Sequence, residues 1–373
     1  MASDVSQSAY TDVIDLTSQA QKERRRDEID SGFREPDPPL DEVTINGLSG
    51  RMEQAVRAAG WTELMPVQRK SIPYTLKERD LIVQSQTGSG KTGAFLLPLF
   101  DLMNPDKKEQ QALILTPTRE LARQIHEEFE QMKIATPHTN RLEAALVYGG
   151  VGYEPQIDAL EKGAQLVIGT PGRTLDHLKK GNFDASTVRM LVLDEADEML
   201  SMGFYPDMKE IIGYLPEERA SYMYSATMPP KVRNAAREFL RDPGFLSLSS
   251  DKVSVEEITY RYYLVKPMDK DRVLEKLLEL EEPESALIFA NTKKEVSYLS
   301  EFLSNAGYDI DEMSGDLSQR KREQALDRLR EGTLRLLVAT DVAARGIDVS
   351  DLSHVFIYDV PQDHEYIIHR SGR

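Results

Sequence analysis

The sequence predicts an α/β protein with two tandem domains, each a mostly parallel sheet with helices on both faces. Three observations lead to this prediction. The chain has 373 residues, enough for two domains of roughly 100–200 residues each. Short apolar runs alternate with longer amphipathic segments, as expected for strands buried between two layers of helices. The alternation stops at a polar segment near residue 250 and then starts again.

Residues 1–40 are polar, with a mixed-charge run and a proline-rich stretch. They predict a leader that is disordered or partly helical. Residues 41–248 then form the first expected domain. Its expected strands are the apolar runs at 81–83, 112–115, 144–147, 165–168, 190–193 and 221–224. Amphipathic segments such as 118–132 predict the helices between them.

A polar segment at 249–257 predicts a linker, and residues 258–373 repeat the pattern as a second domain. Its expected strands are 260–265, 286–289, 335–339 and 354–358. Thr292 and Glu295 are spaced as a capping box at the start of one helix. Gly332 is expected to end the next helix.

The composition is that of a globular protein, with 40% hydrophobic and 29% charged residues. The sequence contains no apolar run of about 18 residues and no basic, apolar signal sequence, which excludes a membrane span and a secretory signal. The absence of cysteine excludes disulfides, zinc–thiolate sites and cysteine nucleophiles. We therefore expect a cytoplasmic protein.

The net charge of −17 argues by itself against a nucleic-acid binder, because phosphate contacts need local positive charge. A basic groove can nevertheless lie on an acidic body. The motifs must therefore decide the class of ligand.

Residues 81–92 read LIVQSQTGSGKT and predict a strand, a glycine-containing turn and a helix that begins at Lys91. They fit the P-loop pattern except that Ser85 holds the first glycine position. Gly88 and Gly90 would let the backbone approach a triphosphate, Lys91 would pair with the β- and γ-phosphates, and Thr92 would be a Mg²⁺ ligand. The alternative is a glycine-rich turn without a ligand.

The apolar run at 190–193 ends in Asp194, Glu195, Ala196 and Asp197. Carboxylates at the end of a parallel strand lie at the sheet edge where a phosphate loop also lies. Asp194 would hold Mg²⁺ through water, and Glu195 would polarise the attacking water. The alternative is an acidic helix N-terminus, which the helix dipole favours. ATP and Mg²⁺ are thus the expected ligands.

These segments resemble the DEAD-box RNA helicases of superfamily 2. The resemblance rests on SQTGSGKT at 85–92, PTREL at 117–121, Gly149–Gly150, TPGR at 170–173, DEAD at 194–197, SAT at 225–227, and then ALIFANTK, GDLSQRKR, ATDVAARGID and HRSGR. Motifs in this order are very specific. They imply two RecA-like domains that close on ATP, with Thr87 and Ser89 also near the phosphates and Asp348 at the ribose.

The resemblance also implies which residues grip the RNA backbone. They are Pro117, Thr118, Arg119, Gly150, Thr170 and Arg173 in the first domain, and Lys293, Gln319, Arg322 and Thr340 in the second. Arginine suits phosphate through its planar fork, and threonine hydroxyls suit phosphate and ribose oxygens. For any one residue the alternative is a helix cap or a surface arginine. Asp197, Ser225, Thr227 and His369 are implied to couple hydrolysis to domain closure.

Gly60, Trp61, Pro66, Val67 and Gln68 resemble the family's Q motif, which recognises adenine. A glutamine amide offers one donor and one acceptor that match the adenine edge. Val43 stands where the family usually has an aromatic residue, and Leu64 and Met65 stand where it usually has Pro-Thr. Both departures concern the apolar contact with adenine.

The family's last motif runs His-Arg-x-Gly-Arg-x-Gly-Arg, and this sequence ends inside it at Arg373, the expected first arginine finger. Ser371 stands where isoleucine is common. We therefore expect a truncated sequence with weak hydrolysis.

The predicted function is that of an ATP-dependent RNA helicase with a monomeric core. It would bind single-stranded or short duplex RNA without strong sequence preference, because backbone contacts carry little sequence information. Two alternatives remain. One is an ATPase that acts on DNA, and the other is an ATP-gated RNA clamp or scaffold with negligible turnover.

Overall fold

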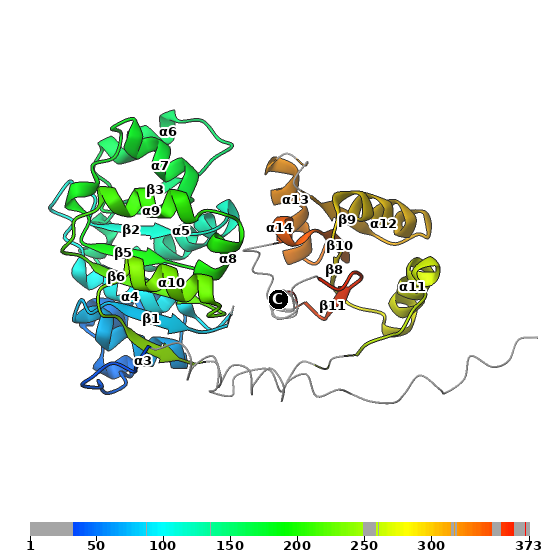
Figure 1. Ribbon diagram of the computed structural model, residues 1–373, viewed down its shortest axis with the longest axis horizontal. Coiled ribbons are helices and arrows are strands. Elements are labelled where there is room, and N and C mark those ends of the chain that lie inside the picture. The colour runs from blue at the N-terminus through cyan, green and yellow to red at the C-terminus, as the bar shows by residue number, and fades with distance from the viewer. Residues whose placement is uncertain are drawn as a thin grey trace, which may run out of the picture. The chain divides into compact units, whose positions relative to one another are not determined.

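The computed structural model describes residues 33–86, 88–134, 136–248, 259, 261–314, 317, 319–344, 352–361 and 370. Contacts divide the chain into two units, here called the first unit (26–251) and the second unit (252–373, with 1–25). Each is described by itself. Every strand pair in the described residues is parallel, and helices cover the sheets, which confirms the predicted fold class (Figure 1).

The first unit is built on a seven-stranded sheet whose strand order differs from the chain order. From edge to edge it consists of β3 (Ala144–Val147), β4 (Leu166–Gly169), β2 (Ala112–Leu115), β5 (Met190–Leu193), β6 (Ala220–Ser225), β1 (Leu81–Gln84) and β7 (Gly244–Ser247). The central strands are buried along their whole length. Their side chains alternate between two apolar cores, since Leu81 and Val83 face one core and Ile82 the other.

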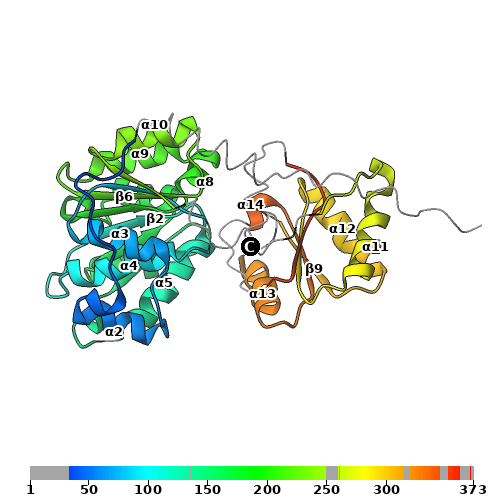
Figure 2. The same ribbon diagram turned by 90° about the horizontal axis from the view of Figure 1, so that it is seen from below.

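Helices cover both faces of this sheet, as Figure 2 shows. One core contains α2 (Gly50–Ala58), α3 (Pro66–Leu76), α4 (Lys91–Leu102) and α5 (Arg119–Lys133). The other contains α6 (Glu154–Glu161), α7 (Pro171–Lys179), α8 (Ala196–Ser201), α9 (Tyr205–Tyr214) and α10 (Pro230–Phe239). Short 3-10 turns lie at Ile45–Gly47, Thr139–Arg141 and Ala185–Thr187.

The second unit has a four-stranded sheet in the order β11 (His354–Ile357), β8 (Ala286–Phe289), β10 (Leu336–Ala339) and β9 (Ile310–Met313). One face packs on α11 (Lys270–Glu281) and α12 (Lys293–Asn305). The other face packs on α13 (Gln319–Arg330) and α14 (Asp341–Ala344). A 3-10 turn, Pro267–Asp269, precedes α11. The predicted capping box of Thr292 and Glu295 is confirmed at the start of α12.

Gly332 follows α13 with a φ of 69°, in the left-handed conformation that a helix-ending glycine adopts, as predicted. The predicted strand at 260–265 is wrong. Residues 261–265 form no strand, and Leu264 is 95% exposed. A strand needs a backbone partner, and none of the described strands pairs with this segment.

The sequence analysis did not predict two of the strands, β9 and β7. The strand β9 contains Asp311 and Glu312 among its four residues, so it is not an apolar run. The strand β7 is short and lies at the edge of its sheet, so it is not a long apolar run either. Residues 33–40, assigned to the leader, belong to the first unit, where Phe245 N donates to Arg34 O and Leu40 N donates to the Tyr74 hydroxyl. The rest of the expected leader and the linker lie outside the described residues. In the described parts of the chain, no helix is long and apolar enough to cross a membrane.

Candidate nucleotide and RNA site

The predicted phosphate loop joins β1 to α4. Gly88 and Gly90 adopt left-handed conformations, with φ of 74° and 85°, which side chains other than glycine disfavour. Lys91 is 7% exposed, and its Nζ donates to the backbone carbonyl of Ser85 at 3.2 Å. The ammonium group therefore lies inside the loop. Ser85 Oγ donates to Ser89 Oγ, which donates to Gln86 O, so the serine at the first glycine position stabilises the loop.

The acidic pair follows β5 in the same sheet. Asp194 and Glu195 are 2% and 7% exposed. Burial raises the pKa of Asp194 to about 7, although the positive charge of Lys91 opposes the shift. Glu195 has a φ of 50°, a left-handed conformation that is strained for this residue. Its Oε2 atom is buried and makes no hydrogen bond within the described structure.

An unsatisfied buried carboxylate oxygen is costly, and strained residues concentrate at functional sites. The strained backbone of Glu195 and its unbonded Oε2 atom both suit a residue that binds water or a ligand. The described residues contain no cluster of three His, Asp or Glu side chains that would cage a metal. The Asp194 carboxylate and the Thr92 hydroxyl are oxygen donors of the kind that Mg²⁺ accepts when phosphates supply other ligands.

Asp197 is bonded to the segment that follows β6. Its Oδ2 accepts from the backbone N of Thr227 at 2.8 Å and from the Thr227 hydroxyl at 2.9 Å. Ser225 Oγ accepts from Asp197 N and donates to Thr227 O. Three of the four residues implied to couple hydrolysis to closure therefore form one network.

Gln68 links the predicted adenine-binding segment to the phosphate loop. It is 2% exposed, its Oε1 accepts from Met65 N at 2.8 Å, and its Nε2 donates to Gly90 O at 3.0 Å. The amide thus bonds within the protein, and its contact with adenine stays a prediction. Gly93, which the sequence analysis missed, makes the packing possible: a Cβ atom there would lie 2.6 Å from Gln68 Nε2 and would overlap the Trp61 ring.

Strand order explains why these segments meet. The strand β6 pairs with β1 on one side and β5 on the other, so the phosphate loop, the SAT segment and the acidic pair leave adjacent strands at their carboxyl ends. Backbone bonds tie the edge together, since Ser85 N donates to Ser225 O and Asp194 N donates to Leu115 O. We call this the nucleotide edge. It matches the general location of ligand sites in parallel sheets.

The predicted RNA residues of the first unit follow the three strands on the other side of β5. The segments after β2, β4 and β3 contain Thr118, Thr170 and Gly150, respectively. Pro117 is buried. The Thr118 hydroxyl accepts from Leu121 N at 3.2 Å and caps α5, the local role that was the alternative for this residue. We call this part of the sheet the RNA edge.

The loop that follows β3 holds two arginines of the RNA edge. A Cβ atom on Gly150 would overlap the guanidinium of Arg119, so the glycine makes room for that arginine. Arg173 Nη1 donates to Val151 O at 3.2 Å, and its guanidinium lies 4.1 Å from the centre of the Tyr153 ring. The sequence analysis did not identify Tyr153 as a residue that supports Arg173. The signal that could have indicated this role was its position three residues after the Gly149–Gly150 pair.

In the second unit, the predicted RNA residues also follow strand ends. Lys293 begins α12 after β8 and is exposed, and Gln319 begins α13 after β9. Thr340 follows β10, is 7% exposed, and its N donates to Met313 O. Arg322 lies within α13. Thr87, Asp348, His369, Arg373 and the side chain of Gln319 lie outside the described residues.

Comparisons with known proteins agree with this geometry. Residues 65–235 match the family "DEAD/DEAH box helicase", and residues 269–373 match "Helicase conserved C-terminal domain". Among curated proteins, the chain is 41% identical to the DEAD-box ATP-dependent RNA helicase CshA of Geobacillus kaustophilus over 327 residues. It is 43% identical to the RNA helicase CrhR of Synechocystis over 328 residues and 42% identical to the ATP-dependent RNA helicase DeaD of Escherichia coli over 327 residues.

Each of these matches covers 88% of this chain, but only 69%, 66% and 52% of the relatives. Among solved structures, the S. cerevisiae Dbp5 structure bound to RNA and ADP BeF3 matches with a TM-score of 0.78 and 32% identity, covering 88% of this chain and 84% of that one. A DEAD box protein from Methanococcus jannaschii matches with a TM-score of 0.54 and 37% identity, covering 90% of each chain. The chain therefore belongs to the DEAD-box family of ATP-dependent RNA helicases.

Proposed function

We propose that this chain is the core of an RNA-dependent ATPase that binds RNA by its backbone and locally unwinds duplexes. The observation that best supports the proposal is the environment of the Glu195 carboxylate. Its buried Oε2 has no hydrogen-bond partner in the described structure, and it follows Asp194, which is close enough to Lys91 for their charges to interact. A carboxylate in this setting can accept a proton from an attacking water.

The other residues of the nucleotide edge have distinct roles in this proposal. Lys91 binds the β- and γ-phosphates, Gly88 to Gly90 present backbone N–H groups to them, and Gln68 with Trp61 lies at the adenine. The Thr92 hydroxyl and the Asp194 carboxylate would hold Mg²⁺, which neutralises charge on the phosphates when bound. Asp197 transmits the state of this edge to Ser225 and Thr227.

RNA would bind along the RNA edge of the first unit and the strand ends of the second. Arg119 and Arg173 supply the phosphate contacts, and the exposed Lys293 adds a third cation. Contacts with ribose hydroxyls would favour RNA over DNA. The Dbp5 structure bound to RNA and ADP BeF3 supports this class of ligand. Weak sequence preference, a monomeric core and a cytoplasmic location remain predictions.

Two variants test the division of roles. Lys91→Ala removes a phosphate partner and is expected to weaken ATP binding. Glu195→Gln keeps the shape but removes the base, so ATP and RNA are expected to bind without turnover. The measurements are ATP affinity, RNA retention and phosphate release, with RNA and DNA of the same sequence compared. Equal loss of ATP binding in both variants would contradict the assignment of Glu195.

The same measurements separate the alternatives. Equal stimulation by DNA would favour an ATPase that acts on DNA. ATP-dependent RNA retention without measurable phosphate release in the parent chain would favour an RNA clamp or scaffold.

A further inference from the structure

The loop that follows β3, residues 148–152, is here called the glycine loop. It contains the Gly149–Gly150 pair of the RNA edge. Gln156 of α6 binds both ends of this loop, since its Nε2 donates to Tyr148 O at 3.3 Å and to Gly152 O at 2.8 Å. Gln156 is 4% exposed. The carbonyl groups at both ends of the glycine loop therefore point toward a buried amide.

The backbone N–H groups of this segment have the opposite surroundings. Within the described structure, the N–H groups of residues 149–153 make no hydrogen bond. A trans peptide is planar and points its C=O and N–H in opposite directions. Each carbonyl that Gln156 binds therefore turns the N–H of the next residue, Gly149 or Tyr153, away from the buried amide.

The glycine loop thus presents hydrogen-bond donors on its outer side. Residues 150–152 are exposed, and a third carbonyl is also occupied, because Arg173 Nη1 donates to Val151 O at 3.2 Å. A loop with bonded carbonyls and unbonded N–H groups exposes mainly the positive ends of its peptide dipoles. Such a surface attracts anions, and the phosphate group of RNA is an anion of suitable size.

His177 of α7 fixes the orientation of the Gln156 amide. It is 0% exposed, and its Nε2 lies 3.3 Å from Gln156 Oε1 in a contact that joins the neighbouring helices α6 and α7 (Figure 1). Because the amide nitrogen already donates to two carbonyls, its oxygen must face His177, which therefore carries a proton on Nε2. Asn182 Nδ2 donates to the other ring nitrogen, Nδ1, at 3.2 Å.

The chemistry of this contact requires an amide at position 156. A glutamine supplies two donors for the two carbonyls and an acceptor for the histidine. A methionine of similar length would leave both carbonyls and the His177 N–H without partners. Buried polar groups without partners are costly, so the glycine loop would turn its carbonyls toward water. The outward N–H groups would then lose their present direction.

We propose that Gln156 is a positioning residue for RNA binding by the first unit. It holds the carbonyl groups of the glycine loop inward, with its amide oriented by His177, so that the loop presents N–H groups to one RNA phosphate. This inference rests on the proposed function, in which RNA binds along the RNA edge. Its consequence is weaker RNA binding without weaker ATP binding when the amide is lost, because β3 and the nucleotide edge lie on opposite sides of β2 and β4 in the sheet.

The experiment measures the affinity for a labelled oligouridine in the presence of ADP–BeF3 and Mg²⁺, and separately the affinity for ATP. We expect Gln156→Met to weaken RNA binding about 10- to 100-fold, the effect of losing a hydrogen bond to a charged group, and to leave ATP affinity unchanged. His177→Phe keeps a ring beside Tyr153 but removes the donor to Gln156, so a smaller loss of RNA affinity is expected. It also serves if Gln156→Met does not fold.

Gln165→Met is the matched control. Gln165 is 0% exposed, and its Nε2 also donates to two carbonyls, Lys107 O at 2.9 Å and Gly163 O at 3.1 Å. Its Oε1 accepts one bond, from Glu143 N at 2.9 Å. It immediately precedes β4, at the opposite end of that strand from the RNA edge. Both methionine variants should lose similar stability in thermal unfolding, but Gln165→Met should retain RNA affinity.

Salt dependence separates the N–H groups from the arginines. A neutral N–H releases no counterion, so Gln156→Met should keep the log–log slope of the parent, whereas Arg173→Ala should reduce it by about 0.7. The inference is overturned if Gln156→Met and His177→Phe both retain RNA affinity, or if Gln165→Met loses as much. It is also overturned if the slope of Gln156→Met falls as that of Arg173→Ala does. A parent chain that does not bind RNA would instead overturn the proposed function.

Discussion

Asp194→Asn is expected to stabilise the protein in the absence of nucleotide and Mg²⁺. The parent carboxylate is 2% exposed, and burial raises its pKa from 3.8 to about 7. Its Oδ1 accepts one hydrogen bond, from Glu195 N at 3.0 Å. An asparagine can keep that bond through its amide oxygen, while it removes the buried charge that Mg²⁺ would compensate.

The pKa shift sets the size and the pH dependence of this effect. A shift of about three units corresponds to roughly 4 kcal/mol, and relaxation around the charge reduces it, so we expect about 2–4 kcal/mol. The folded state binds the proton more tightly than the unfolded state, so the parent loses stability as pH rises from about 4 to 7. The advantage of Asp194→Asn should therefore be largest at pH 8 and should decrease toward pH 5.

The assay is urea unfolding at pH 8 and pH 5, followed by the fluorescence of Trp61, the only tryptophan in the sequence. This residue lies in the same unit as Asp194 and packs against its apolar core. Asp197→Asn is the matched control. Its two carboxylate oxygens accept from Glu198 N and Thr227 N, so an amide must leave one donor unsatisfied, at a cost of about 1–3 kcal/mol.

The reasoning would be refuted if Asp194→Asn were less stable than the parent at pH 8 without Mg²⁺. It would also be refuted if the advantage were the same at both pH values, because burial of a titrating carboxylate requires the difference. With Mg²⁺ and ATP present, the parent should gain stability that the variant does not, since ligands stabilise the state that binds them.

Four further predictions concern the RNA edge and its supports. Gly150→Ala should weaken RNA binding in a gel-shift titration, because a methyl group there would displace Arg119 and the φ of 84° would be strained. Tyr153→Leu should weaken RNA binding by about 0.5–1 kcal/mol, whereas Tyr153→Phe should retain it, because the ring that holds Arg173 remains. RNA affinity should fall with salt with a log–log slope of about −0.7 per phosphate contacted, and a flat response would contradict backbone binding. Burial lowers the pKa of His177, so urea unfolding of the first unit should show stability lost as pH falls below about 6.5, and His177→Gln should reduce that slope.

The location of the first unit's candidate site could be predicted because each motif follows an apolar strand. Lys91, Asp194 and Ser225 are far apart in the sequence, yet β1, β5 and β6 bring them to one edge. A parallel sheet needs only the strand ends to be known for this edge to be assigned. The order of the strands was not needed for that step.

The contacts within the edges could not be predicted from the same patterns. Gln68 has the amide expected for adenine, but the pattern does not show that both ends of the amide bond to Met65 and Gly90. Gly150 was assigned to RNA contact, whereas its structural effect is to leave space for Arg119. Such effects depend on distances between segments that are remote in the sequence.

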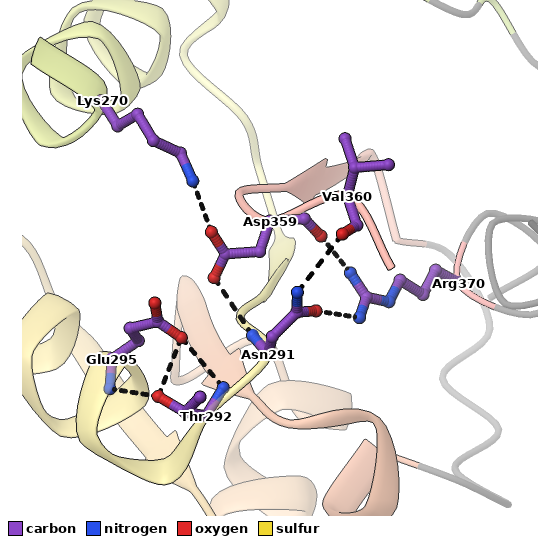
Figure 3. Close-up of polar contacts among 7 residues, drawn as sticks. All are labelled: Lys270, Asn291, Thr292, Glu295, Asp359, Val360 and Arg370. Atoms are coloured by element: carbon purple, nitrogen blue, oxygen red, sulfur yellow. Dashed lines mark hydrogen bonds and ion pairs between the residues drawn. The ribbon is translucent and has the colours of Figure 1, made fainter. Parts of the chain in front are cut away.

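Arg370 and the segment at 260–265 show two different limits. The strand prediction failed at 260–265 because alternating aromatic and apolar residues favour a strand without supplying its partner. Arg370 was overlooked because a buried arginine is rare and the surrounding motif directed attention to Arg373. In the structure, Asp341, Asn291 and the Asp359 carbonyl all accept hydrogen bonds from its buried guanidinium, and these residues are remote from Arg370 in the sequence. Figure 3 shows the bonds to Asn291 and Asp359.

The position of β1 in the first sheet has a consequence for the synthesis of the protein. This strand, which leads into the phosphate loop, pairs only with β6 and β7 among the described strands, and Gln84 is in register with Ser247. Both partners are translated long after β1, near the end of the unit. A ribosome-bound chain must therefore hold an apolar strand without its neighbours until that point, and such intermediates expose surfaces that aggregate or recruit chaperones. Nucleotide binding should accordingly be acquired late and in one step during translation, once β7 has left the ribosome.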